Sequence, residues 1–159
     1  MLLQNNSPSN AFVVPAEYEY VIFSLLPIAF LLLGQGITVG RHRRRAGIAY
    51  PQPYAEKAEA QASREAHLFN CAQRAHANTL EILPAILITV LASGLVFPKA
   101  AAATSLIFFV SRVFYTRGYV TGDPAKRTRN PLYHVSTVST LGLLLVTTYM
   151  VVQSLVLGA

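Results

Sequence analysis

The sequence has few charged residues and almost no cysteine. Charged side chains make up 13% of the 159 residues, against about 25% in ordinary soluble domains. Because 53% of the residues are hydrophobic, a soluble domain of ordinary composition is excluded, and lipid is the expected solvent. Cys71 is the only cysteine, so no intrachain disulfide is possible and the fold must rest on helix packing.

The few acidic residues leave a basic chain, but this charge does not indicate a nucleic-acid partner. The net charge is +6, yet the basic residues cluster between apolar runs, and the sequence contains no recognised nucleic-acid module. The four histidines form no ligand cluster with the lone cysteine, so we expect no metal site.

Four apolar runs are long enough to cross a bilayer, which needs about 20 apolar residues per helix. We therefore predict an all-α fold, an integral membrane four-helix bundle that forms one domain over residues 17–159. The uncharged residues 1–16 are predicted to be a disordered leader. Pro27 and Pro84 lie inside two of the runs, where a kink is expected. The approximate bounds of the runs are residues 18–40, 68–96, 100–119 and 133–157.

The connections between these runs carry unequal charge. Residues 41–65 and 121–131 contain most of the Lys and Arg residues, whereas the second connection has only Lys99. Because cytoplasmic loops carry an excess of Lys and Arg, both basic connections are predicted to face the cytosol. An even number of spans then returns both termini to the opposite side.

The second run contains ionisable residues, which are costly inside a membrane and need a reason to be there. At 100° per residue, Arg74, Asn78 and Glu81 form one polar stripe on the helix. His76 points about 200° away from Arg74. Because one helix then presents ionisable groups on nearly opposite faces, we expect one face inside the subunit and the other at an interface between subunits.

The third run carries a second stripe near its cytosolic end. Arg112, Tyr115 and Tyr119 follow one another at i, i+3 and i+7. The two stripes are predicted to meet in a pocket with guanidinium and phenol donors, an amide and a carboxylate. Such a pocket suits a small zwitterionic ligand that carries carboxylates and an amine.

Two stretches of the sequence resemble a known membrane family. Residues 69–81, FNCAQRAHANTLE, resemble the second-helix signature of the membrane-associated proteins in eicosanoid and glutathione metabolism, the MAPEG family. Residues 118–127, GYVTGDPAKR, resemble the third-helix stretch of microsomal glutathione transferases of the third type within that family. The resemblance extends over about residues 17–155.

The resemblance implies a homotrimer in the endoplasmic reticulum or a related membrane. Glutathione would bind between the subunits, near the cytosolic face. His76 and Arg44 would reach it from the neighbouring subunit, and Glu81 would hold its amine. The residues of one subunit expected to bind glutathione are Arg74, Asn78, Glu81, Arg112, Tyr115 and Tyr119.

Relatives activate the thiol with an arginine shortly after the second tyrosine of the third helix. Counting from Tyr119 leads to Lys126 without gaps and to Arg127 with one gap. We favour Arg127, because a guanidinium stays charged and so stabilises a thiolate more dependably than an amine. The resemblance also implies an auxiliary role for Arg45.

The expected function is a glutathione-dependent transferase with peroxidase activity, which conjugates lipophilic electrophiles and reduces lipid hydroperoxides. Ile82 stands where leukotriene-forming relatives have a tyrosine, so leukotriene synthesis is in doubt. The main alternative is a non-catalytic lipid-binding or adaptor protein on the same fold, and another is a channel or transporter subunit. The polar stripe could also be only a buried ion pair that fixes helix register, the tyrosines an interfacial belt, and the arginine clusters topology anchors.

Overall fold

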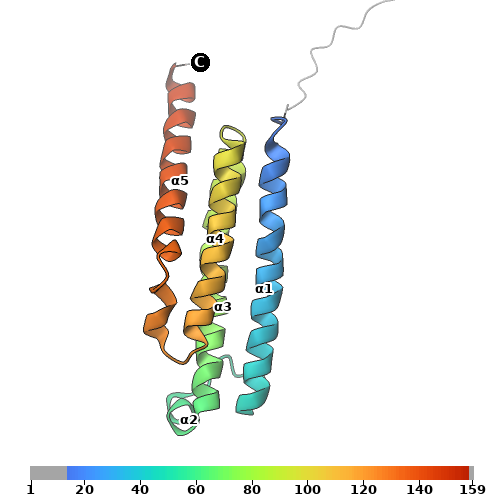
Figure 1. The fold of residues 1–159 in the computed structure, drawn as a ribbon, viewed down its shortest axis with the longest axis vertical. Helices are drawn as coiled ribbons and strands as arrows, with labels where there is room; N and C mark the ends of the chain where they lie inside the picture. The colour runs from blue at the N-terminus through green and yellow to red at the C-terminus, as the bar shows by residue number, and fades with distance from the viewer. Residues whose placement is uncertain (1–13, 158–159) are drawn as a thin grey trace, which may run out of the picture.

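The computed structural model describes residues 14–157, and these are mostly helical (Figure 1). Four long helices are joined by one short helix and one 3-10 helix, and residues 14–157 contain no strand. The predicted all-α bundle is thus confirmed, whereas the predicted leader lies mostly outside the described residues. The elements are α1 (Tyr18–Ala46), α2 (Lys57–Ala62), α3 (Arg64–Gly94), α4 (Pro98–Tyr119), η1 (Pro124–Thr128) and α5 (Leu132–Leu157).

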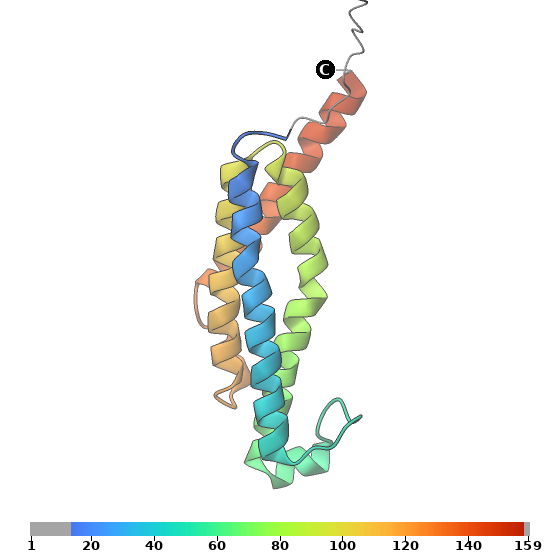
Figure 2. The ribbon, with the colours of Figure 1, turned by 90° about the vertical axis from the view of Figure 1, so that its right-hand side faces the viewer.

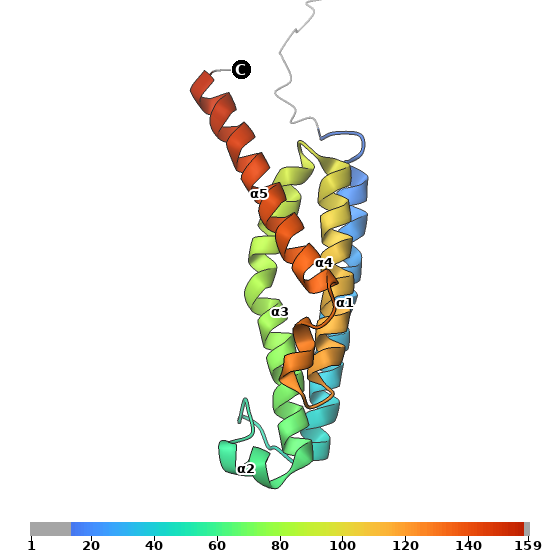
Figure 3. The same cartoon turned by 60° about the vertical axis from the view of Figure 1, so that its left-hand side comes forward.

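Helices α1, α3 and α4 run side by side and form a three-helix core (Figure 2). Helix α5 packs against α4 and α3 through its first part, then leans away from them (Figure 3). A buried hydrogen bond from Thr147 Oγ1 to Ser93 Oγ, 2.8 Å long, joins α5 to α3. Beyond this bond the apolar side chains of α5 are exposed, including Val151, Leu155 and Val156.

Three of the described helices, α1, α3 and α5, are long and apolar enough to cross a membrane by length and composition. The fourth predicted span corresponds to α4, which has 22 residues and lies beside α1 and α3 in the same bundle. At 1.5 Å per residue this helix is about 33 Å long. It carries Lys99, Arg112 and Arg117, so the uncharged run between Lys99 and Arg112 is shorter than a bilayer span needs.

The interior of the bundle combines apolar side chains with small residues that let the helices approach closely. The hydroxyl of Ser105 on α4 donates to the carbonyl of Ser24 on α1 over 3.0 Å. Gly94 faces the side chain of Val21, and a Cβ added at Gly94 would lie 2.8 Å from that side chain. The principal apolar core residues are Val21, Ile28, Ile86, Val90, Ala101 and Phe108.

A buried glutamine ties the three core helices together. Gln35 on α1 is 3% exposed, and its Nε2 donates to Thr79 Oγ1 over 3.0 Å and to Thr116 Oγ1 over 2.7 Å. Its Oε1 lies 3.3 Å from Nδ1 of His76. Because a buried amide without partners is costly, this set of bonds specifies one register for α1, α3 and α4.

The basic end of α1 is helical, although the sequence suggested that the helix ends near residue 40. The helix continues to Ala46 and closes at Gly47, which has a φ of 68°. Its last turn contains three arginines, which interact favourably with the negative end of the helix dipole. One of them, Arg43, is buried and donates to the carbonyl of Gln52 over 2.7 Å, so it holds the following loop.

Candidate functional site

Four polar side chains from α3 and α4 form a hydrogen-bonded chain. Arg74 Nη1 lies 2.6 Å from Glu81 Oε1, and Asn78 Nδ2 donates to Glu81 Oε2 over 3.4 Å. Arg112 Nη1 on α4 donates to Asn78 Oδ1 over 2.8 Å. The two stripes seen in the sequence therefore lie in contact, joined by the bond between Arg112 and Asn78.

This polar chain runs from the interior of the subunit to its surface. Arg112 is 4% exposed, whereas the side chains of Arg74 and Glu81 are 45% and 54% exposed. The exposed pair lies on α3, one of the helices apolar enough to cross a membrane, and the neighbouring Leu80 and Ile82 are exposed too. Within one subunit the pair is therefore half-exposed and not buried.

Three tyrosines pack against the buried end of this chain. The rings of Tyr115 and Tyr119 meet edge to face at 5.2 Å, and Tyr115 stacks on Tyr133 at 5.8 Å. The guanidinium of Arg112 lies 4.7 Å from the centre of the Tyr115 ring. Tyr115 and Tyr119 are 4% and 8% exposed, so they are packed inside the subunit and do not form an exposed interfacial belt.

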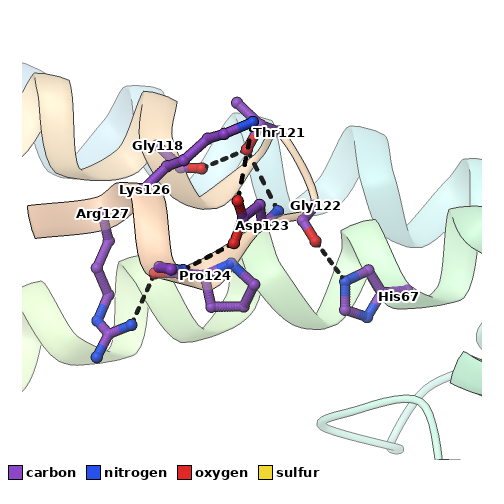
Figure 4. Close-up of polar contacts among 9 residues, drawn as sticks. His67, Gly118, Thr121, Gly122, Asp123, Pro124, Lys126 and Arg127 are labelled. Atoms are coloured by element: carbon purple, nitrogen blue, oxygen red, sulfur yellow. Dashed lines mark hydrogen bonds and ion pairs between the residues drawn. The ribbon is translucent and has the colours of Figure 1, made fainter. Parts of the chain in front are cut away.

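Helix η1 brings the two candidate thiol-activating residues to the end of α4 (Figure 4). Arg127 lies with its guanidinium carbon 5.7 Å from the centre of the Tyr119 ring, and its Nη1 donates to the carbonyl of Pro124 over 2.7 Å. Lys126 points to the opposite side, where its Nζ lies 3.8 Å from Asp123 Oδ2. The tyrosines thus connect Arg127, but not Lys126, to the polar chain.

Glycine at residue 118 allows this arrangement. A Cβ added at Gly118 would lie 2.6 Å from the carbonyl oxygen of Lys126 and 2.8 Å from Cα of Arg127. Since real Cβ contacts are almost never shorter than 3.0 Å, η1 could not approach α4 so closely with any larger residue. The short distance between η1 and α4 depends on this glycine.

The structure separates His76 from the polar chain of α3. Its ring nitrogen Nδ1 faces Gln35 on α1, as described above, while Arg74 and Glu81 lie on the exposed face of α3. The two faces of α3 inferred from the sequence are thus distinct: Arg74 and Glu81 lie on the exposed face, and His76 is half-buried beside α1. A contact from His76 to a ligand in a neighbouring subunit stays a prediction.

Arg44 and Arg45 lie at the end of α1 and are exposed. Arg44 contributes to an open hollow of about 570 Å³ whose other lining residues include Arg41 and Tyr50. Among residues 14–157, no hydrogen bond or ion pair joins either arginine to Arg74 or Glu81. Within one subunit these arginines therefore stand apart from the polar chain, and their predicted roles require a second subunit.

A mainly apolar cavity of about 160 Å³ lies between α3, α4 and α5. Arg112 and Tyr133 contribute to its wall, so the cavity adjoins the polar chain. The sequence did not single out Tyr133, which the register of α5 against α4 brings into the site. Other residues that line the cavity are Ile82, Ala85, Ile86, Thr89, Phe108 and Leu144.

Among residues 14–157, no group of three His, Cys, Asp or Glu side chains could hold a metal ion.

The sequence also did not reveal the contact that His67, near the start of α3, makes with Gly122. Its Nε2 lies 2.9 Å from the carbonyl oxygen of Gly122, in the segment that joins α4 to η1 (Figure 4). The residues are 55 positions apart, and no local pattern pairs them.

The chain matches a known protein family. The model of the MAPEG family matches residues 21–149, which includes the polar chain on α3, the tyrosines of α4 and the residues of η1. The match covers well over half of the sequence. The chain therefore belongs to the MAPEG family, whose members include membrane enzymes of glutathione and eicosanoid metabolism.

Proposed function

We propose that this protein is a glutathione-dependent membrane transferase with peroxidase activity. The observation that carries the proposal is the half-exposed Arg74–Glu81 pair on a membrane-crossing helix. Ionisable groups exposed within an apolar surface are costly unless something polar covers them. Glutathione offers two carboxylates for guanidinium groups and an ammonium group for Glu81, so it matches both signs of charge.

We also propose that the subunits form a homotrimer with glutathione bound between them. The exposed face of α3 carries both the ion pair and apolar residues such as Leu80 and Ile82, a composition that suits an interface better than lipid. In this arrangement His76 and Arg44 of the neighbouring subunit approach the ligand. The basic loops support an orientation in which this end of the bundle faces the cytosol, and the endoplasmic reticulum is the membrane that the family resemblance favours.

Arg127 is the residue that we propose to stabilise the glutathione thiolate. Its guanidinium is adjacent to Tyr119, whose ring contacts Tyr115 and so leads back to the polar chain. Lys126 is near Asp123 and borders an outward hollow with Arg117 and Arg129, which makes it the weaker candidate. A fixed positive charge beside sulfur favours the thiolate, which is the reactive nucleophile.

One thiolate accounts for both proposed reactions. With a lipophilic electrophile, sulfur forms a bond to carbon and the leaving group departs with the electron pair. With a lipid hydroperoxide, sulfur attacks the terminal oxygen, the O–O bond breaks, and the lipid alcohol leaves after taking up a proton. The resulting glutathione sulfenic acid then condenses with a second glutathione to give the disulfide and water.

The cavity between α3, α4 and α5 would hold the apolar part of the second substrate. An apolar cavity of about 150 Å³ is large enough for benzene, and this one measures about 160 Å³. It would therefore accept an aromatic ring or a short piece of an acyl chain. Because Arg112 borders both the cavity and the polar chain, the reacting end of such a substrate would lie near glutathione.

The proposal is tested by titrating glutathione into the purified full-length protein in detergent while thiolate absorbance is followed. We expect saturable thiolate formation, and turnover with an aryl halide and with a lipid hydroperoxide. Arg127→Ala should retain glutathione binding, measured as thermal stabilisation, but lose thiolate absorbance and slow turnover by roughly 100-fold. Lys126→Ala is the matched control and should resemble the wild type.

Two results would refute this proposal in different ways. A folded wild-type protein that neither binds glutathione nor turns over either substrate would remove the enzymatic function and favour a lipid-binding or adaptor role. Normal thiolate formation in Arg127→Ala, together with its loss in Lys126→Ala, would transfer the activating role to the lysine.

A further inference from the structure

The segment that joins α4 to η1 is attached to α3 through His67. The imidazole Nε2 lies 2.9 Å from the carbonyl oxygen of Gly122. Because a carbonyl oxygen can only accept a hydrogen bond, Nε2 must carry the hydrogen. The sulfur of Cys71, one turn further along α3, lies 3.6 Å from the same nitrogen and is buried, so the ring is packed against its own helix on one side.

Gly122 itself fits closely against α3. Its φ of +85° lies in the left-handed region, where side chains other than glycine are strained. A Cβ added at Gly122 would lie 3.2 Å from Cδ2 of Leu68 and 3.7 Å from Cδ2 of His67. The backbone of residue 122 is therefore in direct contact with the first part of α3.

Two hydrogen bonds and a short stretch of backbone connect Gly122 to the guanidinium of Arg127. Residue 123 follows Gly122 directly, and the Asp123 carboxylate accepts from the backbone N–H of Ala125 over 3.1 Å, which caps η1. The carbonyl of Pro124 then accepts from Arg127 Nη1 over 2.7 Å. The position of this guanidinium thus depends on where Gly122 is held (Figure 4).

The segment from Gly122 to Thr128 is held at two places, once on α4 and once on α3. On the α4 side, Gly118 allows the backbone of residues 126 and 127 to approach closely. On the α3 side, the hydrogen bond from His67 fixes residue 122. Without the hydrogen bond from His67, the segment keeps its covalent connection to α4 but loses its register against α3. Helix α3 is the one that carries Arg74, Asn78 and Glu81.

We infer that His67 is a positioning residue, which holds the Gly122 carbonyl so that Arg127 lies in register with the glutathione-binding face of α3. This inference rests on the proposed function and adds to it a residue that touches neither substrate. Because His67 acts through the loop, its loss should impair the chemical step and leave glutathione binding by Arg74 and Glu81 almost intact.

The experiment compares His67→Ala, His67→Gln and His134→Ala with the wild type, all full length in detergent. The glutamine amide can donate to the Gly122 carbonyl in place of Nε2, whereas alanine offers no donor. His134, at the start of α5, is exposed and is the matched control. For His67→Ala we expect kcat to fall roughly 10- to 100-fold through misplacement of Arg127, with KM for glutathione changed less than about threefold. His67→Gln should recover most of the lost rate.

A second measurement does not depend on activity. Trypsin cleaves after Lys126, Arg127 and Arg129, and a loop released from α3 becomes a better substrate. Mass spectrometry of timed digests should show faster cleavage at these sites in His67→Ala, but not in His67→Gln or His134→Ala. Melting temperatures of all variants show whether the bundle itself stays folded.

The outcomes separate this inference from the proposed function. If the wild type is active and folded His67→Ala has the same kcat and the same cleavage rate, the positioning role is wrong while the proposed function stands. If His67→Ala and His67→Gln lose activity equally, the hydrogen bond is not the reason and the inference fails. If the wild type shows no glutathione-dependent turnover, the proposed function fails, and the positioning role fails with it.

Discussion

The close approach of η1 to α4 offers the sharpest test of the site geometry, through the change Gly118→Ala. The added methyl group would meet the Lys126 carbonyl oxygen at 2.6 Å and Arg127 Cα at 2.8 Å, whereas ordinary contact begins at about 3.4 Å. Both atoms belong to backbone, so no side-chain rotation relieves the overlap. The 3-10 helix must retreat by several tenths of an ångström, and Arg127 moves with it.

Two opposing contributions determine how much Gly118→Ala changes the free energy of unfolding. Overpacking of this kind costs about 1–3 kcal/mol, while alanine in a helix gains about 0.5–1 kcal/mol over glycine. We therefore expect a net loss of about 1 kcal/mol, which lowers the melting temperature by about 2–4 °C in a chain of this size. Because a displacement of about 1 Å can cost 100-fold in rate, kcat should fall about 10-fold.

The assay pairs thermal melting in detergent with steady-state turnover of an aryl halide. Gly142→Ala on α5 is the matched control, because a Cβ added there has no atom within 4 Å and should be neutral or slightly stabilising. If Gly118→Ala melts and turns over like Gly142→Ala, then η1 does not depend on close contact with α4, and the proposed position of Arg127 is wrong.

Three further changes probe other parts of the molecule. Gln35→Leu removes the hydrogen bonds to Thr79 and Thr116 and the contact with the half-buried His76, and it should cost about 1–3 kcal/mol of stability. An unchanged melting temperature would contradict the role of Gln35. Glu81→Gln should leave melting nearly unchanged, because the pair with Arg74 is half exposed, but should weaken glutathione binding about 10-fold in a thermal-shift titration. Ala85→Phe should fill the cavity and raise KM for a bulky lipophilic substrate about 10-fold. An equal rise in KM for glutathione would exclude the cavity as the site of the lipophilic substrate.

Local patterns in the sequence predicted the helices and the polar faces well, because helical spacing is a property of neighbouring residues. The periodicity that groups Arg74, Asn78 and Glu81 on one face needs no knowledge of the remaining fold. The end of α1 differs from the sequence prediction for a local reason as well. A cluster of arginines is typical of a loop, but a positive last turn is also favourable for a helix.

Contacts between distant residues could not be predicted in this way. His67 meets Gly122 across 55 residues, and Gln35 meets Thr116 across 81. Each pairing depends on how far one helix has slid along another, which the hydrophobic pattern constrains only loosely. The same limit applies to Arg127 and Lys126, which neighbour each other in sequence but point to opposite sides of η1.

The burial of Cys71 has a consequence for redox chemistry. Cys71 is 4% exposed, and its sulfur lies 3.6 Å from Nε2 of His67. Because it is the only cysteine, the chain offers no accessible thiol that a peroxide could oxidise. In the proposed peroxide reduction, both electrons are then drawn from two molecules of glutathione, and the protein leaves each cycle chemically unaltered. Recovery from a burst of lipid peroxidation would depend on the supply of reduced tripeptide and not on repair of the enzyme.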